Sequence, residues 1–140
     1  MRTYWDTSAV MNAAVSAEVA RLLDSGEHVT RTHTFSEFFN RMTGRGIRWV
    51  HASGQAHALV MDPGDAAAWL AEFARRIGEA DLGREETLAA LTEAKARGVT
   101  GRMVHDWLHA CAAQKAGCER LLTRNTDDFW LLGAPAAWPD

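Results

Sequence analysis

The sequence contains only two cysteines, Cys111 and Cys118, among its 140 residues. Both fall on one predicted helix, where a spacing of seven residues places them about two turns apart. This separation is too long for an ordinary disulfide. We therefore expect two free, buried thiols and no disulfide framework.

Long apolar segments are also missing. No run approaches the roughly 20 apolar residues that a membrane span requires. The first ten residues, MRTYWDTSAV, carry an acid at Asp6 where a signal peptide would have a continuous apolar segment. The sequence therefore predicts a protein with no membrane segment, located in the cytoplasm.

A generally basic surface is absent, because the formal net charge is -3. Proteins that bind nucleic acids usually obtain general attraction from a positive surface. Any such contact in this chain must therefore be local. The densest basic stretch contains Arg41, Arg45 and Arg48, and we expect most of the other arginines to lie on a solvated surface.

The overall composition is that of an ordinary folded protein, with 47% hydrophobic and 24% charged residues. A chain of 140 residues is close to the commonest size of one domain. We find no internal repeat, low-complexity tract or interdomain linker. We therefore expect a single domain over residues 1–140.

Strand-like and helix-like segments alternate along the chain. The expected strands are residues 3–5, 28–31 and 119–123, a weak hairpin at 47–61 and a short segment at 80–82. The expected helices follow Asp6, Ser16 and Thr34, and span residues 62–77, 85–97 and 101–116. This alternation predicts an α/β fold, an α/β/α sandwich around a mainly parallel sheet.

Some side-chain orientations and turns follow from the same pattern. Helical spacing predicts that Leu88, Leu91 and Ala94 point inward. Thr7 and Ser8 offer hydroxyls suited to capping the first helix. Residues 125–128 have the composition of a turn.

Four acidic residues occupy positions from which they can converge. Asp6 and Asp128 follow predicted strands, and Glu37 and Asp106 lie in the first turns of predicted helices. In an open parallel sheet the ligand site lies beyond the carboxyl ends of the strands. Four converging carboxylates repel one another unless a dication neutralises them. Mg²⁺ suits such oxygen ligands, Mn²⁺ is also possible, and either metal can activate water for attack on phosphorus.

The segments around these acids resemble a known family. DTS near the amino terminus, TFSEF, HDWLHACAA and LLTRNTDDF are similar, in this order, to motifs of the PIN-domain family, and in particular of VapC-type ribonuclease toxins. The resemblance covers nearly the whole chain, except residues 45–61. It implies a PIN-like fold and a Mg²⁺-dependent endoribonuclease that acts as the toxin of a toxin-antitoxin pair.

The resemblance also implies roles for individual residues. Asp6, Glu37, Asp106 and Asp128 match the four catalytic acids, of which Asp6 and Asp106 are the expected direct metal ligands. Glu37 and Asp128 would position waters or a second ion. Asn125 stands where some relatives carry an additional acid. The expected partners are an RNA substrate, a small antitoxin that blocks the acidic site, often with an arginine, and a second copy in a homodimer.

Three of these acids also have a purely structural explanation. Asp6 could simply be the acid that ends the first strand. Thr34 and Glu37 have the spacing of a helix capping box, which needs no metal. Asp106 is a favourable charge near a helix start. Asp127 competes with Asp128 for the fourth position, and we favour Asp128 because it immediately precedes Phe129.

Other residues near these segments have open roles. His105 and His109 share a helix face and could bind a soft metal, but without a third ligand we expect surface or partly buried histidines. Ser8, Thr123 and Arg124, with Thr7, border the proposed site, where they would contact phosphate or serve as caps. Trp49 is the tryptophan that we would test for stacking on RNA.

Two other functions compete with the ribonuclease. The first is a non-catalytic PIN-like module that docks a protein or RNA partner. The second is a phosphate-handling hydrolase or phospho-receiver, which we rank last. The segment after Asp6 lacks a second Asp two residues on, and no lysine is suitably placed after the final strand. The sequence does not reveal which RNA would be cleaved.

Overall fold

The computed structural model describes residues 1–50 and 53–139. Its main sheet has five parallel strands in the order β5-β2-β1-β6-β7. These strands are β1 Arg2–Trp5, β2 Glu27–Thr30, β5 Gly78–Glu79, β6 Arg120–Leu122 and β7 Ala136–Ala137. A separate antiparallel hairpin pairs β3 Ile47–Val50 with β4 Ala56–Leu59. The predicted hairpin is therefore confirmed, although residues 51 and 52 of its connection lie outside the described residues.

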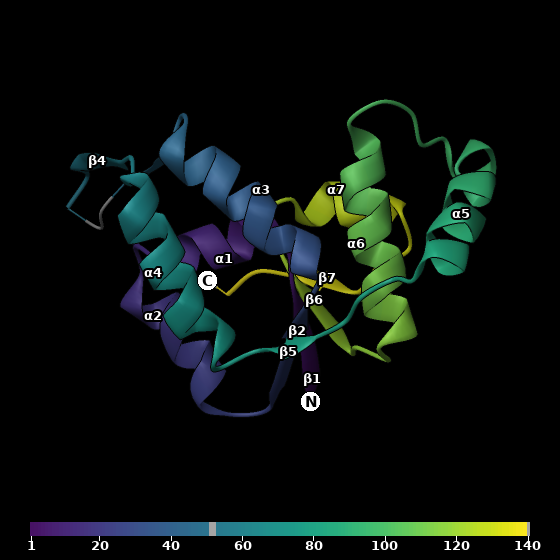
Figure 1. Ribbon diagram of the computed structural model, residues 1–140, viewed down its shortest axis with the longest axis horizontal. Helices are drawn as coiled ribbons and strands as arrows, with labels where there is room; N and C mark the ends of the chain where they lie inside the picture. Colours follow the sequence, from purple (N-terminus) through teal and green to yellow (C-terminus); the bar gives the residue numbers. More distant parts are fainter. Residues whose placement is uncertain (51–52, 140) are drawn as a thin grey trace.

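Helices cover both faces of the main sheet (Figure 1). The first group comprises α1 Thr7–Ala13, α2 Ala17–Ala20, α3 Thr32–Thr43 and α4 Pro63–Ala74, with the 3-10 turn η1 Arg21–Asp24. The second comprises α6 Met103–Lys115 and α7 Thr126–Leu131, while α5 Arg84–Glu93 and the 3-10 turn η2 Lys95–Arg97 lie beyond α6 (Figure 1). The predicted α/β/α sandwich around a parallel sheet is confirmed. No helix among the described residues is long and apolar enough to cross a membrane.

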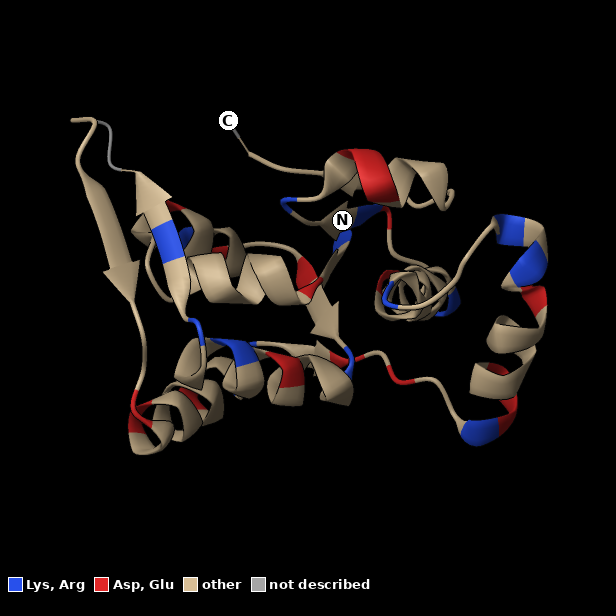
Figure 2. Cartoon of the chain, turned by 90° about the horizontal axis from the view of Figure 1, so that it is seen from above, with Lys and Arg blue, Asp and Glu red and all other residues tan. Residues whose placement is uncertain are grey.

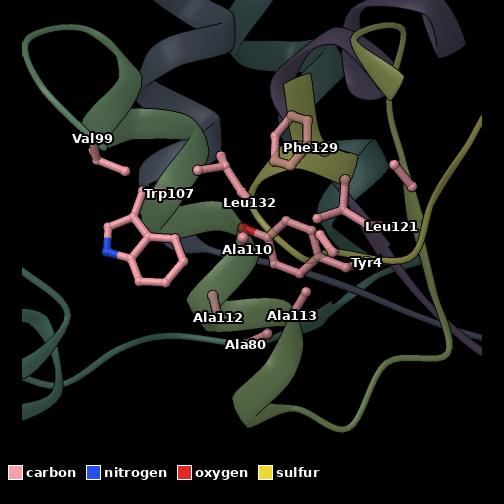
Figure 3. Close-up of a cluster of buried hydrophobic side chains, with 12 residues drawn as sticks. Tyr4, Ala80, Val99, Trp107, Ala110, Ala112, Ala113, Leu121, Phe129 and Leu132 are labelled. Atoms are coloured by element: carbon pink, nitrogen blue, oxygen red, sulfur yellow. The ribbon is translucent and has the colours of Figure 1, made fainter. Parts of the chain in front are cut away.

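Alternation along the central strand β1 joins the two halves of the core. Tyr4 is fully buried in a cluster with Trp107 of α6 and Phe129 of α7 (Figure 3). The next residue, Trp5, is fully buried on the other face with Phe38 of α3. Because β1 is covered on both faces, its carboxyl end is held rigidly between the two helix layers.

The start of α3 differs from the prediction. The helix begins at Thr32, so Thr34 lies inside it, where its hydroxyl oxygen accepts a hydrogen bond from the Thr30 hydroxyl at 2.8 Å. The cap comes instead from Asp81, whose carboxylate accepts bonds from the backbone N–H and the hydroxyl of Thr32 at 2.6 and 2.7 Å. The predicted capping box of Thr34 and Glu37 is therefore wrong, because a distant carboxylate satisfies the helix start.

The orientation of α5 also differs from the prediction. Leu88 and Leu91 are 51% and 41% exposed, and Ala94 is half-buried. The buried residue of this helix is Ala90, whose carbonyl accepts a hydrogen bond from the indole N–H of Trp107 at 2.8 Å. The helix packs against α6 at the side of the molecule opposite the β3–β4 hairpin (Figures 1 and 2). Because α5 lies outside the sandwich, its leucines do not reach the core.

Three further expectations have clear outcomes. Residues 125–128 do not form a turn, because Asn125 is the N-cap residue of α7, and the helix brings Phe129 into the core. The strand expected at 80–82 lies at Gly78–Glu79. Cys111 and Cys118 are free, as predicted, but they are half-buried, and Cys118 lies beyond the end of α6 and not on the same helix.

Candidate functional site

The carboxylate of Asp6 is fixed at the carboxyl ends of β1 and β6. Its Oδ1 accepts hydrogen bonds from the Ala9 N–H at 2.9 Å and the Ser8 hydroxyl at 2.7 Å. Its Oδ2 accepts a bond from the Thr123 hydroxyl at 2.6 Å. Asp6 is only 3% exposed and lies where the sequence predicted, at the end of the first strand. The side chain therefore has one well-defined orientation.

Asp6 itself caps α1, so the prediction that Thr7 and Ser8 provide the cap is wrong. The Ser8 oxygen donates to Asp6 and also accepts the backbone N–H of Arg124 at 2.9 Å. Thr123 likewise accepts the N–H of Asn125 at 3.0 Å. The hydroxyls of Ser8 and Thr123 therefore hold the acid and the loop before α7 in place.

Glu37 on α3 is held by a hydrogen-bonded chain that crosses the core. Its Oε1 lies 3.0 Å from Nε2 of His109 on α6, and Nδ1 of the same ring lies 2.6 Å from the Tyr4 hydroxyl of β1. A carboxylate only accepts, so Nε2 of His109 carries the proton that it donates to Glu37. His109 is 2% exposed, so the expectation of a surface or partly buried histidine is wrong.

No sequence pattern indicated this role of His109. Tyr4, Glu37 and His109 form this hydrogen-bonded chain. They come from β1, α3 and α6 and are far apart in the sequence. His105 lies one turn earlier on α6 and has a ring contact of its own. Its ring stacks on His33 of α3, with centroids 5.8 Å apart and planes 15° from parallel.

The carboxyl of Asp106 is half-buried, and the charges of the other three acids affect its pKa. It lies in the first turn of α6, as predicted. Burial raises its pKa most, the charges of Asp6, Asp128 and Glu37 raise it further, and the charge of His109 opposes them. The charges of the other three predicted acids therefore reach Asp106 in the folded protein.

The other two buried acids have shifts of opposite direction. Burial raises the pKa of Asp6, although the His109 charge and the bonds from Thr123 and Ser8 oppose it. Burial also acts on Glu37, but its hydrogen bond and charge interaction with His109 hold its pKa below the usual value. Glu37 therefore stays ionised more readily than Asp6 or Asp106.

The fourth acid lies on α7, where both Asp127 and Asp128 are exposed. The charge of Asp128 acts on Asp106 across the space between α7 and α6. This interaction agrees with the preference for Asp128 over Asp127.

The donor chemistry of this group fits a hard divalent cation. Asp6, Asp106 and Asp128 offer carboxylate oxygens only, which Mg²⁺ and Mn²⁺ prefer. The raised pKa values of Asp6 and Asp106 reflect burial and, for Asp106, like-charge repulsion, which a cation would relieve. Among the described residues, however, the one group of three or more such ligand atoms within 4.8 Å of one another is a different one, made of His33, Glu37 and His105.

A cavity of about 520 Å³ adjoins Asp6, because its wall includes Ser8, whose hydroxyl bonds that acid. Its charged and aromatic wall residues come from α3, β3 and the loop before α7. They are Arg41, Arg48, Arg124 and Trp49. Two of these side chains also have ring partners: Trp49 stacks on His57 at 5.3 Å, and the Arg124 guanidinium lies 5.1 Å from the Trp138 ring centroid. Arg124 therefore joins two arginines of the basic stretch, Arg41 and Arg48, around a cavity that reaches Asp6 through Ser8.

Comparison with known proteins gives structural relatives but no match in sequence. No family model matches the chain, and no curated protein matches it. VapBC2 from Rickettsia felis, solved with a DNA fragment from its promoter, has a TM-score of 0.67 and 15% identity, with 100% of each chain covered. VapBC-1 from nontypeable Haemophilus influenzae has a TM-score of 0.61 and 17% identity over 100% of this chain and 98% of that one.

A third similar structure is VapC20 from Mycobacterium tuberculosis, described as a toxin that cleaves the sarcin-ricin loop. Its TM-score is 0.55 at 17% identity, over 85% of this chain and 86% of that one. At these identities the similarity concerns the fold. The fold expected from the resemblance is confirmed, because the chain shares the fold of these VapBC and VapC structures.

Proposed function

We propose that the protein is a Mg²⁺-dependent endoribonuclease and the toxin of a toxin-antitoxin pair. The observation that supports this most is the placement of Asp6, which three hydrogen bonds fix, almost fully buried, at the carboxyl ends of β1 and β6. The charges of Asp6, Asp128 and Glu37 also raise the pKa of Asp106. Acids that are buried and repel one another destabilise a fold, and a bound cation would offset this cost. The similarity of the whole fold to VapC structures favours nuclease chemistry at this group.

In this proposal Asp6 and Asp106 hold Mg²⁺, or Mn²⁺, and Glu37 and Asp128 position water. The bound cation would supply an activated water and neutralise charge that develops on the phosphate. The bonds from Ser8 and Thr123 keep Asp6 in place, so little reorganisation is needed when substrate binds.

His109 acts on Glu37 in two ways. Its N–H fixes the orientation of the carboxylate, and its interaction lowers the Glu37 pKa. An ionised Glu37 can accept a proton from a water molecule in the site. We infer that Glu37 is the general base or the water-orienting residue, and that His109 positions it.

The cavity beside Asp6 would hold the RNA strand. Arg41, Arg48 and Arg124 carry guanidinium groups that can bind phosphate oxygens in pairs. Trp49 provides a ring on which an unpaired base can stack. Together they would supply the local attraction that a chain of net charge -3 otherwise lacks. This arrangement favours a single-stranded segment or a loop.

The partner would be a small antitoxin encoded nearby, which would place an arginine among the four acids. Such an arginine would form ion pairs with the carboxylates that otherwise bind the cation. The homodimer belongs to the same proposal and would be measured by sedimentation of the purified protein.

Sequencing of RNA ends tests the activity and identifies the substrate. Wild-type protein and Asp106→Asn would be expressed briefly, and new RNA 5′ ends mapped in each culture. We expect recurrent new ends and arrested growth with wild type only. Wild-type protein that produces no new ends and no arrest would contradict the nuclease and favour a non-catalytic binding module.

A further inference from the structure

Two histidines and a glutamate gather at the contact of α3 with α6. His33 and Glu37 come from α3, His105 comes from α6, and their ligand atoms lie within 4.8 Å of one another. We propose that these three residues form a second metal site, which binds Zn²⁺ or a similar borderline transition ion. Its regulatory consequence rests on the proposed nuclease function, because Glu37 belongs to both donor groups.

The distances between the three side chains are close to those between the ligands of a bound Zn²⁺ ion. His33 and Glu37 are one helical turn apart, so they share a face of α3, and Nε2 of His33 lies 3.9 Å from Oε1 of Glu37. Ligands of one tetrahedral Zn²⁺, at about 2.0–2.1 Å each, lie about 3.4 Å from one another. The observed group therefore needs only a small contraction.

The side chains have room for this contraction. The His33 side chain is 46% exposed and His105 is exposed, whereas that of Glu37 is 21% exposed. The two rings already lie nearly parallel at 5.8 Å. Small rotations of two surface histidines would bring their nitrogens to the fixed carboxylate.

Glu37 is fixed by an outer partner, as metal-binding side chains usually are. Its Oε1 accepts the hydrogen bond from buried His109, which in turn contacts the Tyr4 hydroxyl. This chain places the carboxylate before a metal arrives. Three protein ligands would leave a fourth tetrahedral position for water.

The two neighbouring donor groups have different chemistry. Imidazole nitrogens favour Zn²⁺, Co²⁺ or Ni²⁺, whereas the oxygen-only group of Asp6, Asp106 and Asp128 favours Mg²⁺ or Mn²⁺. An ion held by His33 and His105 would also bind Glu37. The negative charge of Glu37 would then no longer be available to the group of Asp6, Asp106 and Asp128. Micromolar Zn²⁺ would therefore inhibit the proposed nuclease while Mg²⁺ is present.

Metal titration of the purified protein tests the site without any activity measurement. Calorimetry with Zn²⁺ and visible spectroscopy with Co²⁺ would compare wild type with His33→Ala/His105→Ala. His57→Ala, on β4, is the control for the loss of a histidine outside the group. Circular dichroism would verify that each variant is folded, which we expect because His33 and His105 lie at the surface.

We expect one tight Zn²⁺ equivalent in wild type and His57→Ala, and a Co²⁺ spectrum of tetrahedral type. The double variant should lose affinity by roughly a hundredfold or more, since loss of an outer partner alone costs 10–100-fold. Asp106→Asn should keep the Zn²⁺ site, because this acid is not a ligand in it. Unchanged Zn²⁺ binding in the double variant, or no tight binding in wild type, would overturn the site.

The regulatory consequence has its own readout. Cleavage in Mg²⁺ should be inhibited by Zn²⁺ in wild type and resist it in the double variant. Equal Zn²⁺ inhibition of both proteins would overturn regulation through this site. A protein that binds Zn²⁺ as expected but never cleaves RNA in Mg²⁺ would contradict the nuclease and leave the metal site standing.

Discussion

Glu37 on α3 and His109 on α6 are joined by a hydrogen bond of 3.0 Å between Oε1 and Nε2. The histidine is buried and its other nitrogen contacts the Tyr4 hydroxyl at 2.6 Å. The orientation of one proposed catalytic acid therefore depends on the central strand of the sheet. This coupling of site and core leads to the first prediction.

Tyr4→Phe should destabilise the protein by about 1–3 kcal/mol, because it leaves the buried Nδ1 of His109 without a partner. Urea denaturation at pH 7 measures this change. Thr92→Val removes an exposed hydroxyl from α5 and should change the free energy of unfolding by less than about 0.5 kcal/mol. Equal stability of Tyr4→Phe and wild type would show that the hydroxyl does not support His109.

Asp128→Asn should reduce RNA cleavage about a hundredfold, which is the effect of losing a group that positions or activates water. Asp127→Asn removes the same charge from the neighbouring position of α7 and should cleave at nearly the wild-type rate. Initial rates with a labelled RNA in Mg²⁺ provide the comparison. The assignment of the fourth acid would be wrong if Asp127→Asn were the impaired variant.

Asp106→Asn should stabilise the metal-free protein, and increasingly so as the pH rises. The pKa of Asp106 is raised above its ordinary value of 3.8, so the folded state binds its proton more tightly than the unfolded state. The contribution of Asp106 to stability is complete below that ordinary value. It is lost as the pH rises through the folded-state pKa.

Thermal unfolding in EDTA, between pH 4 and about pH 8, measures this effect. The melting temperature of Asp106→Asn should approach that of wild type at the acid end and exceed it by a few degrees at neutral pH. Mg²⁺ should then stabilise wild type more than the variant. A gap between the two proteins that does not change with pH would contradict the raised pKa.

Arg41→Ala/Arg48→Ala should bind single-stranded RNA more weakly. The affinity of this variant should also depend less on the salt concentration. Two lost phosphate contacts reduce the slope of log affinity against log salt by about 1.4. Arg75→Ala/Arg84→Ala removes the same charge from exposed positions outside the cavity and should keep the wild-type slope. Fluorescence anisotropy in EDTA, where the proposed cleavage is blocked, gives both slopes. Identical slopes for the two double variants would exclude the cavity as the phosphate-binding region.

The sequence predicted the features that depend on neighbouring residues. The position of Asp6 follows from a short β-prone run that ends at an acid, and the position of Asp106 follows from a helix with a clear apolar pattern. The sheet follows from the alternation of such segments. These features are local, so one stretch of sequence contains the information for each.

The features that the sequence did not predict arise from tertiary contacts. Thr34 and Glu37 have capping-box spacing, but Asp81 occupies the helix start and His109 binds Glu37. Leu88 has the spacing of an inward residue, but no periodicity reveals that α5 lies outside the sandwich. Arg41 and the loop before α7 line the same cavity, which their distant positions in the sequence do not indicate.

Cleavage of a labelled RNA by the purified protein, in Mg²⁺ and in EDTA, tests the metal-dependent nuclease most directly. Wild type and Asp127→Asn should cleave in Mg²⁺ and stop in EDTA, and Asp106→Asn should be inactive in both while remaining folded. Cleavage at the wild-type rate in EDTA, or by Asp106→Asn in Mg²⁺, would contradict a metal-dependent nuclease at these four acids.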